Sequence, residues 1–197
     1  MYHYLTLARP FTLLPPLLGI ISGAICAWGS AHNPDPTRTL TASVILTVTL
    51  GSLCAAFLNA ANNTLNQIYD LEIDRVNKPK RPLPAGTLSL GEAWGFTILT
   101  TLVAWLLAWL ATPVGLDPHR ECFWIVLFTS FMCWAYSAPP LQTKRKGLWA
   151  NVTIATPRGV LLKVAGWSAV KTIAGVEPWF IGAIFGLFLL GASTTKD

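Results

Sequence analysis

Long apolar segments separated by short polar loops make up most of this chain. Six segments have the composition of membrane-crossing helices, which need roughly 20 mostly apolar residues. They cover residues 11–30, 40–66, 91–111, 121–138, 149–169 and 178–195. Pro15 and Pro16 predict a kink in the first segment. The pattern therefore predicts an all-α integral membrane protein, with six transmembrane helices in one domain over residues 1–197.

The composition agrees with a membrane protein. The 197 residues are 53% hydrophobic and 12% charged, with a mean hydropathy of +0.51, whereas a soluble domain carries roughly 25% charged residues. The four cysteines lie in or beside apolar segments without a C-x-x-C spacing, which favours small packing residues over a metal site. The first apolar segment lacks a basic region before it and a cleavage site after it, which indicates a retained helix.

Basic residues gather in the even-numbered loops. The loops after the second and fourth predicted spans hold these bases: Arg75, Lys78, Lys80, Arg81, Lys144, Arg145 and Lys146. The positive-inside bias then predicts that both loops and both termini face the cytoplasm, with the protein embedded in the lipid bilayer. The same bias accounts for the net charge of +5, so no nucleic-acid partner is expected. Tryptophans such as Trp94, Trp149 and Trp179 mark span ends, as an interfacial aromatic belt requires.

The segment "NQIYDLEIDRVNKPKRP", residues 66–82, holds three acids and four bases at the predicted exit of the second span. Asn66, Asp70 and Asp74 are spaced four apart, which places an amide and two carboxylates along one face of a helix. Oxygen ligands of this kind suit Mg²⁺ shared with phosphate oxygens, and the bases that follow suit phosphate charge. The alternative from spacing alone is a solvated helix end.

Three strings in the chain resemble the UbiA superfamily of intramembrane prenyltransferases. "NQIYDLEIDRVNKPKRPLPAG" (66–86) is similar to the first family signature, N-x-x-x-D-x-x-x-D followed by R-P-L-x-x-G. "YSAPPLQTK" (136–144) resembles the loop after the fourth helix, and "LARPFT" (7–12) resembles the start of the first helix. The amino-acid sequence around the acids is most similar to that of members that prenylate homogentisate-like rings. This similarity implies a role in quinone biosynthesis.

The resemblance implies Mg²⁺-dependent transfer of an isoprenoid chain from an allylic prenyl diphosphate to a small, aromatic acceptor. It implies metal ligation by Asn66, Asp70 and Asp74 in the first acidic motif and by Asp197 in a second one. Tyr136, with Asp70 and Asp74, is a candidate catalytic residue, facing the allylic cation or else lying in the aromatic belt. The candidate phosphate contacts are Arg9, Arg75, Lys78, Arg81 and Lys144.

Two bases lie inside the fifth predicted span, in "NVTIATPRGVLLKVAGW". Charges within a membrane are costly and are functional by default. Arg158 lies about ten residues from either end of this span, so we expect it to face a cavity and contact an anionic acceptor or the diphosphate. Asn151 is a candidate to join it. Lys163 has the alternative of snorkelling to the interface.

One departure from the family concerns length. Members have about nine helices around a central cavity and a second acidic motif after the sixth, whereas this sequence stops at Asp197 directly after its sixth predicted span. The resemblance therefore implies an incomplete bundle with little activity alone. Two other functions remain open at this stage: a transporter or channel that uses the intramembrane charges, and a non-catalytic membrane scaffold.

Overall fold

The computed structural model describes residues 2–31, 39–113 and 120–194, and these residues form helices joined by short loops. The helices are α1 (Tyr2–Ala8), η1 (Pro10–Leu13), α2 (Leu14–Gly29), α3 (Ala42–Tyr69), α4 (Leu71–Asn77), α5 (Leu90–Leu110), α6 (Glu121–Ser137), η2 (Thr143–Arg145), α7 (Leu148–Ala155), η3 (Thr156–Leu161), α8 (Leu162–Ser168) and α9 (Glu177–Thr194). The predicted all-helical fold is confirmed, and the long helices lie within a few residues of the predicted ranges.

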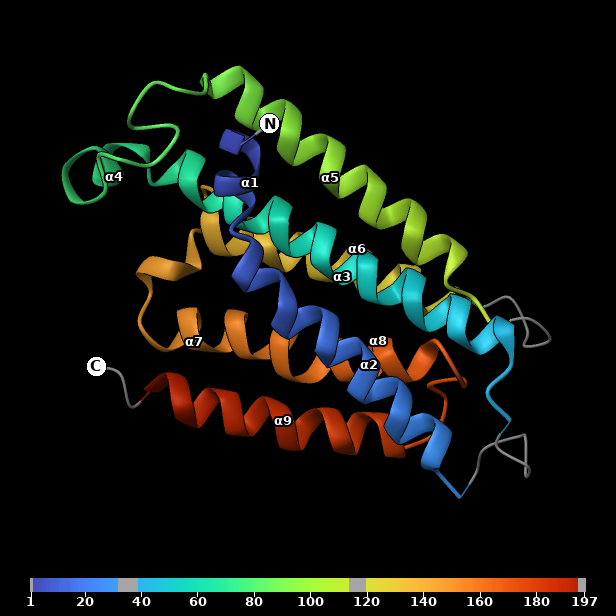
Figure 1. The fold of residues 1–197 in the computed structure, drawn as a ribbon. Helices are drawn as coiled ribbons and strands as arrows, with labels where there is room; N and C mark the ends of the chain where they lie inside the picture. Colours follow the sequence, from blue (N-terminus) through green and yellow to red (C-terminus); the bar gives the residue numbers. More distant parts are fainter. Residues whose placement is uncertain (1, 32–38, 114–119, 195–197) are drawn as a thin grey trace.

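The helices pack side by side as a bundle (Figure 1). α5 lies along one side and α9 along the opposite side, while α2, α3, α6 and the α7–α8 rod fill the space between them. Among the residues that the structure describes, three helices are long and apolar enough to cross a membrane: Pro10–Gly29, Ala42–Tyr69 and Leu90–Leu110. Glu121–Ser137 and Glu177–Ser193 are shorter apolar helices. Length and composition therefore support three of the six predicted spans.

The first and fifth predicted spans differ from simple rods. Pro15 and Pro16 occupy the first turn of α2, where a missing backbone N–H costs nothing, so they begin the helix and do not kink its middle. The fifth span is continuous but contains η3, a π-helical stretch over Thr156–Leu161 that includes Pro157. A π-bulge absorbs an irregularity in the hydrogen-bond ladder and is often found at functional sites.

Small residues allow α2, α8 and α9 to approach closely. A Cβ atom added to Gly166 in α8 would lie 2.2 Å from the Ile20 carbonyl oxygen in α2. One added to Gly159 in η3 would lie 2.5 Å from the Gly186 Cα in α9. Such contacts are typical of helix packing inside membranes, where small residues bring backbones together.

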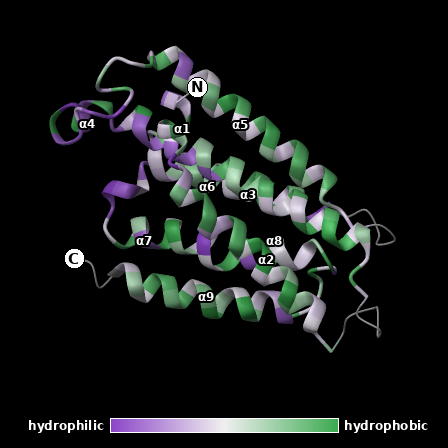
Figure 2. Cartoon of the chain, in the orientation of Figure 1, coloured by the Kyte–Doolittle hydropathy of each residue, from purple (hydrophilic) through white to green (hydrophobic). Residues whose placement is uncertain are grey.

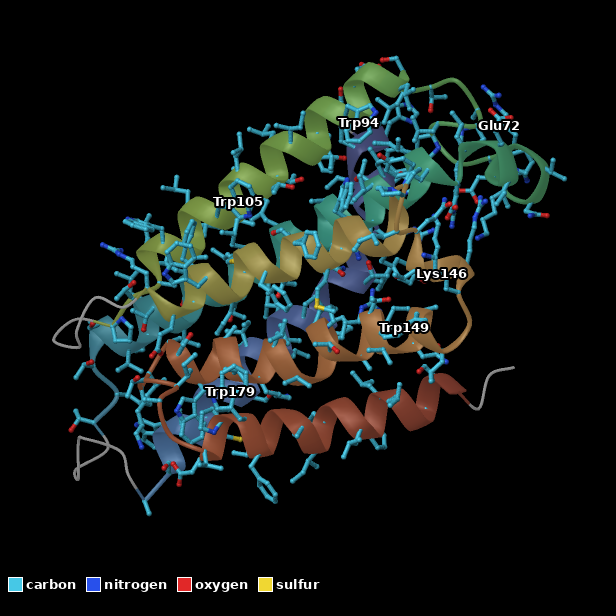
Figure 3. All side chains as sticks on the ribbon, turned by 180° about the vertical axis from the view of Figure 1, so that it is seen from behind. Glu72, Trp94, Trp105, Lys146, Trp149 and Trp179 are labelled. Carbon is cyan, nitrogen blue, oxygen red and sulfur yellow. The ribbon has the colours of Figure 1, made fainter. Side chains whose placement is uncertain are left out.

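Polar and charged residues collect at one end of the bundle (Figure 2). This end contains α1, α4, the loop after α4 and the start of α7. Glu72, Lys146, Trp94 and Trp149 lie there, and Trp179 lies at the opposite end (Figure 3). Both base-rich loops thus share one end, which is the arrangement that the positive-inside argument needs. We call it the polar end below.

Candidate functional site

The acidic segment breaks where α3 ends. α3 stops at Tyr69 and α4 starts at Leu71, so Asp70 caps one helix and precedes the other. The three residues therefore span the junction of two helices. The helical register nevertheless persists, because Asp70 N–H donates to the Asn66 carbonyl at 2.9 Å and Asp74 N–H donates to the Asp70 carbonyl at 2.7 Å. This retained i to i+4 spacing keeps all three side chains beside one cavity.

Asp70 and Asp74 are each paired with a base. Lys144 Nζ donates to Asp70 Oδ1 at 2.6 Å, and Arg81 donates to Asp74 Oδ2. Lys78 Nζ lies 3.9 Å from Asp74 Oδ1. Burial raises the pKa of the Asp74 carboxyl above its ordinary value, and the positive charge of Lys78 offsets part of that shift. The ionised form of Asp74 therefore depends on its basic neighbours.

These side chains surround a cavity of about 170 Å³, which we call the polar cavity. Its lining residues are Arg9, Asn66, Gln67, Asp70, Asp74, Lys78, Arg81, Tyr136 and Lys144. Four bases and two acids give it a net charge of +2. A cavity with this charge attracts a polyvalent anion such as a diphosphate, and lysine and arginine provide the matching hydrogen-bond donors.

Side-chain amides of α3 position the segment that carries Arg9. Asn63 Nδ2 donates to the Ala8 carbonyl at 2.8 Å, and Gln67 Nε2 donates to the Leu7 carbonyl at 2.9 Å. Arg9 itself has the left-handed backbone conformation, with φ of 57°. Asn63 and Gln67 were not predicted as site residues. Their spacing of four was the available signal.

A second cavity, of about 290 Å³, continues into the bundle, and we call it the inner cavity. It shares Asn66 and Tyr136 with the polar cavity. Arg158 also lines it, at the η3 stretch, which places this base on the cavity as its depth in the span predicted. Ser137 donates to the Asn66 Oδ1 atom and fixes the amide between the two cavities.

Several predicted residues lie elsewhere. Arg75 is exposed and donates to Glu72 Oε1 at 2.7 Å, away from the described lining of both cavities. Asn151 in α7 is likewise not among the described lining residues. Lys163 is buried rather than snorkelling: it donates to Ser22 and its Nζ lies 4.1 Å from the centre of the Phe185 ring.

The metal-ligand prediction rests on Asn66, Asp70 and Asp74, because Asp197 lies outside the described residues. Within the described ranges, no group of three His, Cys, Asp or Glu side chains gathers to hold a metal by itself. Mg²⁺ is usually held by one or two carboxylates and by substrate phosphates rather than by an all-protein cage. Two carboxylates and one amide beside phosphate-binding bases therefore fit a Mg²⁺ ion that a diphosphate would share.

Comparisons with known proteins agree with this arrangement. A family profile described as the UbiA prenyltransferase family matches residues 13–197. The chain is 32% identical over 195 residues to the chloroplastic homogentisate solanesyltransferase of Arabidopsis thaliana, covering 96% of this chain and 48% of that protein. It is 27% identical over 198 residues to a digeranylgeranylglyceryl phosphate synthase of Methanobrevibacter smithii, covering 100% of this chain and 63% of that one.

The fold is also similar to a solved structure. A UbiA homologue from Archaeoglobus fulgidus, bound to DMAPP and Mg²⁺, superposes with a TM-score of 0.71 at 25% identity, covering 96% of this chain and 62% of that one. The chain thus spans about half to two thirds of the length of these three proteins. Their full activities belong to longer proteins.

Proposed function

This chain belongs to the UbiA prenyltransferase family, and from that premise we propose that it forms the donor-binding part of an intramembrane prenyltransferase. It is accordingly part of an integral, multi-pass membrane protein. The reaction we propose is Mg²⁺-dependent transfer of an isoprenoid chain from an allylic prenyl diphosphate to a small acceptor. The observation that carries the proposal is the polar cavity of net charge +2, which adjoins the more apolar inner cavity and shares Asn66 and Tyr136 with it.

The bases of the polar cavity would bind the diphosphate of the donor. Arg9, Lys78, Arg81 and Lys144 come from three separate parts of the chain, so they can surround the anion from several sides. When bound, Mg²⁺ would supply positive charge that stabilises the leaving diphosphate. As the C–O bond breaks, its electron pair goes to the diphosphate oxygen, where these bases stabilise the developing charge.

The inner cavity would hold the acceptor and the reacting carbon. There the acceptor forms a new bond to the allylic carbon and releases a proton. Tyr136 lies where the two cavities meet, and its ring suits a carbocation. Arg158 supports an acceptor with an anionic group. We propose an electron-rich aromatic acceptor of the homogentisate type, and hence a role in quinone biosynthesis, because a relative of that name aligns with 96% of this chain.

Two further parts of the proposal concern the rest of the protein. Asp197 would begin a second acidic motif that completes the metal site in the full-length enzyme. The polar end would face the cytoplasm, as the base-rich loops after α4 and α6 predict. Labelling of single cysteines introduced in these loops from each side of the membrane measures this orientation.

The test is transfer of labelled prenyl diphosphates by the full-length protein to a panel of ring and glycerol-phosphate acceptors. We expect activity that requires Mg²⁺ and that Asp70→Ala or Asp74→Ala reduces by at least about a hundredfold, or roughly 2.7 kcal/mol of transition-state stabilisation. Glu72→Gln is the matched control, since Glu72 lies in the same segment but is exposed and pairs with Arg75. Full activity in both aspartate variants would refute the metal and donor assignment.

A further inference from the structure

A third hollow lies between α3, α5 and α6, and we call it the α5–α6 groove. Its volume is about 470 Å³. Its lining residues are Leu58, Ala61, Asn62, Leu65, Trp94, Thr97, Thr101, Trp105, Leu127, Ser130, Phe131, Cys133 and Trp134. Trp94 lies near the polar end and Trp105 lies further along α5 (Figure 3), so the groove runs along the helix away from the charged residues.

The hydroxyls of Thr97 and Thr101 and the indole N–H of Trp105, which line the α5–α6 groove, are satisfied by the protein itself. The Thr97 hydroxyl donates to the Ala93 carbonyl at 2.9 Å, and the Thr101 hydroxyl donates to the Thr97 carbonyl at 2.7 Å. Trp105 Nε1 donates to Ser130 Oγ at 3.0 Å. With these groups occupied, the threonines and the tryptophan offer mainly methyl and ring carbon to a ligand. The groove is therefore suited to a hydrocarbon chain.

The groove adjoins the site already described. It shares Leu58, Asn62 and Cys133 with the inner cavity. The inner cavity shares Asn66 and Tyr136 with the polar cavity in turn. The three hollows therefore lie in series, so a ligand whose charged head lies among the bases would reach the groove by way of the inner cavity.

The small volume of the inner cavity explains why a donor with a long isoprenoid tail would need the α5–α6 groove as well. Pockets for small ligands measure roughly 300–1,000 Å³. At about 290 Å³ the inner cavity is at the lower limit of that range, and it must hold an acceptor beside the reacting carbon. An isoprenoid tail of several units therefore needs additional apolar space, and the adjoining groove provides about 470 Å³.

We propose that the α5–α6 groove binds the distal isoprene units of the donor, and that its width sets how strongly longer donors are preferred. This proposal rests on the proposed function. The occupant is the donor tail rather than an acyl chain of a bilayer lipid, because the groove joins the diphosphate site through shared residues. Phe131 and Trp134, whose rings stack with centroids 6.1 Å apart, lie along the groove and provide flat carbon surface for the tail.

A substitution that fills the groove tests the proposal. We expect Thr101→Trp in the full-length protein to weaken geranylgeranyl diphosphate binding by about tenfold or more, a change of roughly 1.4 kcal/mol. Binding of dimethylallyl diphosphate should stay within about twofold of wild type, because its single isoprene unit ends in the inner cavity. Leu99→Trp is the matched control: Leu99 is on the same helix but 61% exposed and outside the described groove lining, so neither donor should be affected.

Binding would be measured by calorimetry in lipid nanodiscs with Mg²⁺ present, so that the result does not depend on an acceptor. Equal weakening of both donors, or of neither, would overturn the groove assignment. A wild-type protein that binds neither donor would instead refute the proposed function, which separates the two failures.

A second measurement avoids any variant and applies even if Thr101→Trp fails to fold. A donor with a photoreactive group at the far end of its tail is bound to the wild-type protein and irradiated. We expect crosslinks in the α5 and α6 peptides that contain Trp105 and Phe131, and excess unlabelled donor should abolish them. Crosslinks confined to α2 or α8 would overturn the proposal. So would groove labelling by a photoreactive phospholipid that excess donor does not displace.

Discussion

The buried ion pair between Asp74 and Arg81 allows folding and donor binding to be separated. The Asp74 side chain is 4% exposed and that of Arg81 is 22% exposed. Removing one member of a fully buried pair costs about 3–5 kcal/mol, because the other charge loses its partner. Arg81 keeps access to the polar cavity, and asparagine retains a hydrogen-bond acceptor, so we expect Asp74→Asn to cost less, about 2 kcal/mol. That corresponds to a fall in melting temperature of about 4–8 °C.

The second substitution distinguishes the two roles. Adding Arg81→Gln removes the orphaned charge, so the double variant should recover at least half of the lost stability, whereas donor binding should stay weak because a metal ligand and a phosphate contact are both missing. Thermal unfolding followed by tryptophan fluorescence measures stability, and calorimetry with a prenyl diphosphate and Mg²⁺ measures binding. An Asp74→Asn variant that melts like wild type would refute the structural role. Restored donor binding in the double variant would refute the ligand role.

Three further predictions follow from the same geometry. Arg158→Gln should raise the acceptor KM by about tenfold while donor affinity stays unchanged, as measured by steady-state kinetics and calorimetry; a change confined to the donor would contradict an acceptor contact. Gly166→Ala should destabilise the bundle by about 1–3 kcal/mol, because the new Cβ would meet the Ile20 carbonyl at 2.2 Å, and an unchanged melting temperature would contradict the close packing. Arg75→Gln should change donor affinity less than about twofold, since Arg75 pairs with exposed Glu72 and such pairs contribute little; a tenfold loss would place Arg75 at the diphosphate.

Hydropathy predicted the helices well and their irregularities poorly. The segment predicted at 40–66 is α3, Ala42–Tyr69, because a long uncharged run in a membrane protein has few alternatives to a helix. Hydropathy did not predict the break at Asp70. The spacing did not reveal it either, because α4 continues with the same four-residue spacing of polar side chains. The η3 stretch was also unpredicted. Proline interrupts a helix, but the neighbouring helices decide whether a kink or a π-bulge results.

Sequence motifs predicted several residues that line the polar cavity. Asn66, Asp70 and Asp74 were found from their spacing, and Lys144 from a motif far along the chain, and they line one cavity. Arg75 stands next to Asp74 in sequence, yet its side chain leaves the helix in a different direction and pairs with Glu72. Adjacent positions on a helix differ by about 100°, so nearness in sequence does not place a base at a shared cavity.

α3 connects these observations because it carries two rows of polar side chains at the same spacing. Asn59, Asn63 and Gln67 form one row, and all three donate to backbone carbonyls of the segment from Leu7 to Thr12. Asn62, Asn66 and Asp70 form the other row, and each lines a cavity.

The two rows are one residue out of step, so they lie about 100° apart around the helix. One row therefore fixes the segment that carries Arg9, while Asn66 and Asp70 of the other row line the polar cavity together with Arg9. Within the described residues, Asn62 Oδ1 is buried and has no hydrogen-bond partner, whereas Asn66 Oδ1 in the same row accepts from Ser137. A buried unsatisfied acceptor is costly unless a ligand or water completes it. Its place where the inner cavity meets the α5–α6 groove gives α3 a third contribution to the site, at the point where an acceptor and a donor tail would have to pass each other.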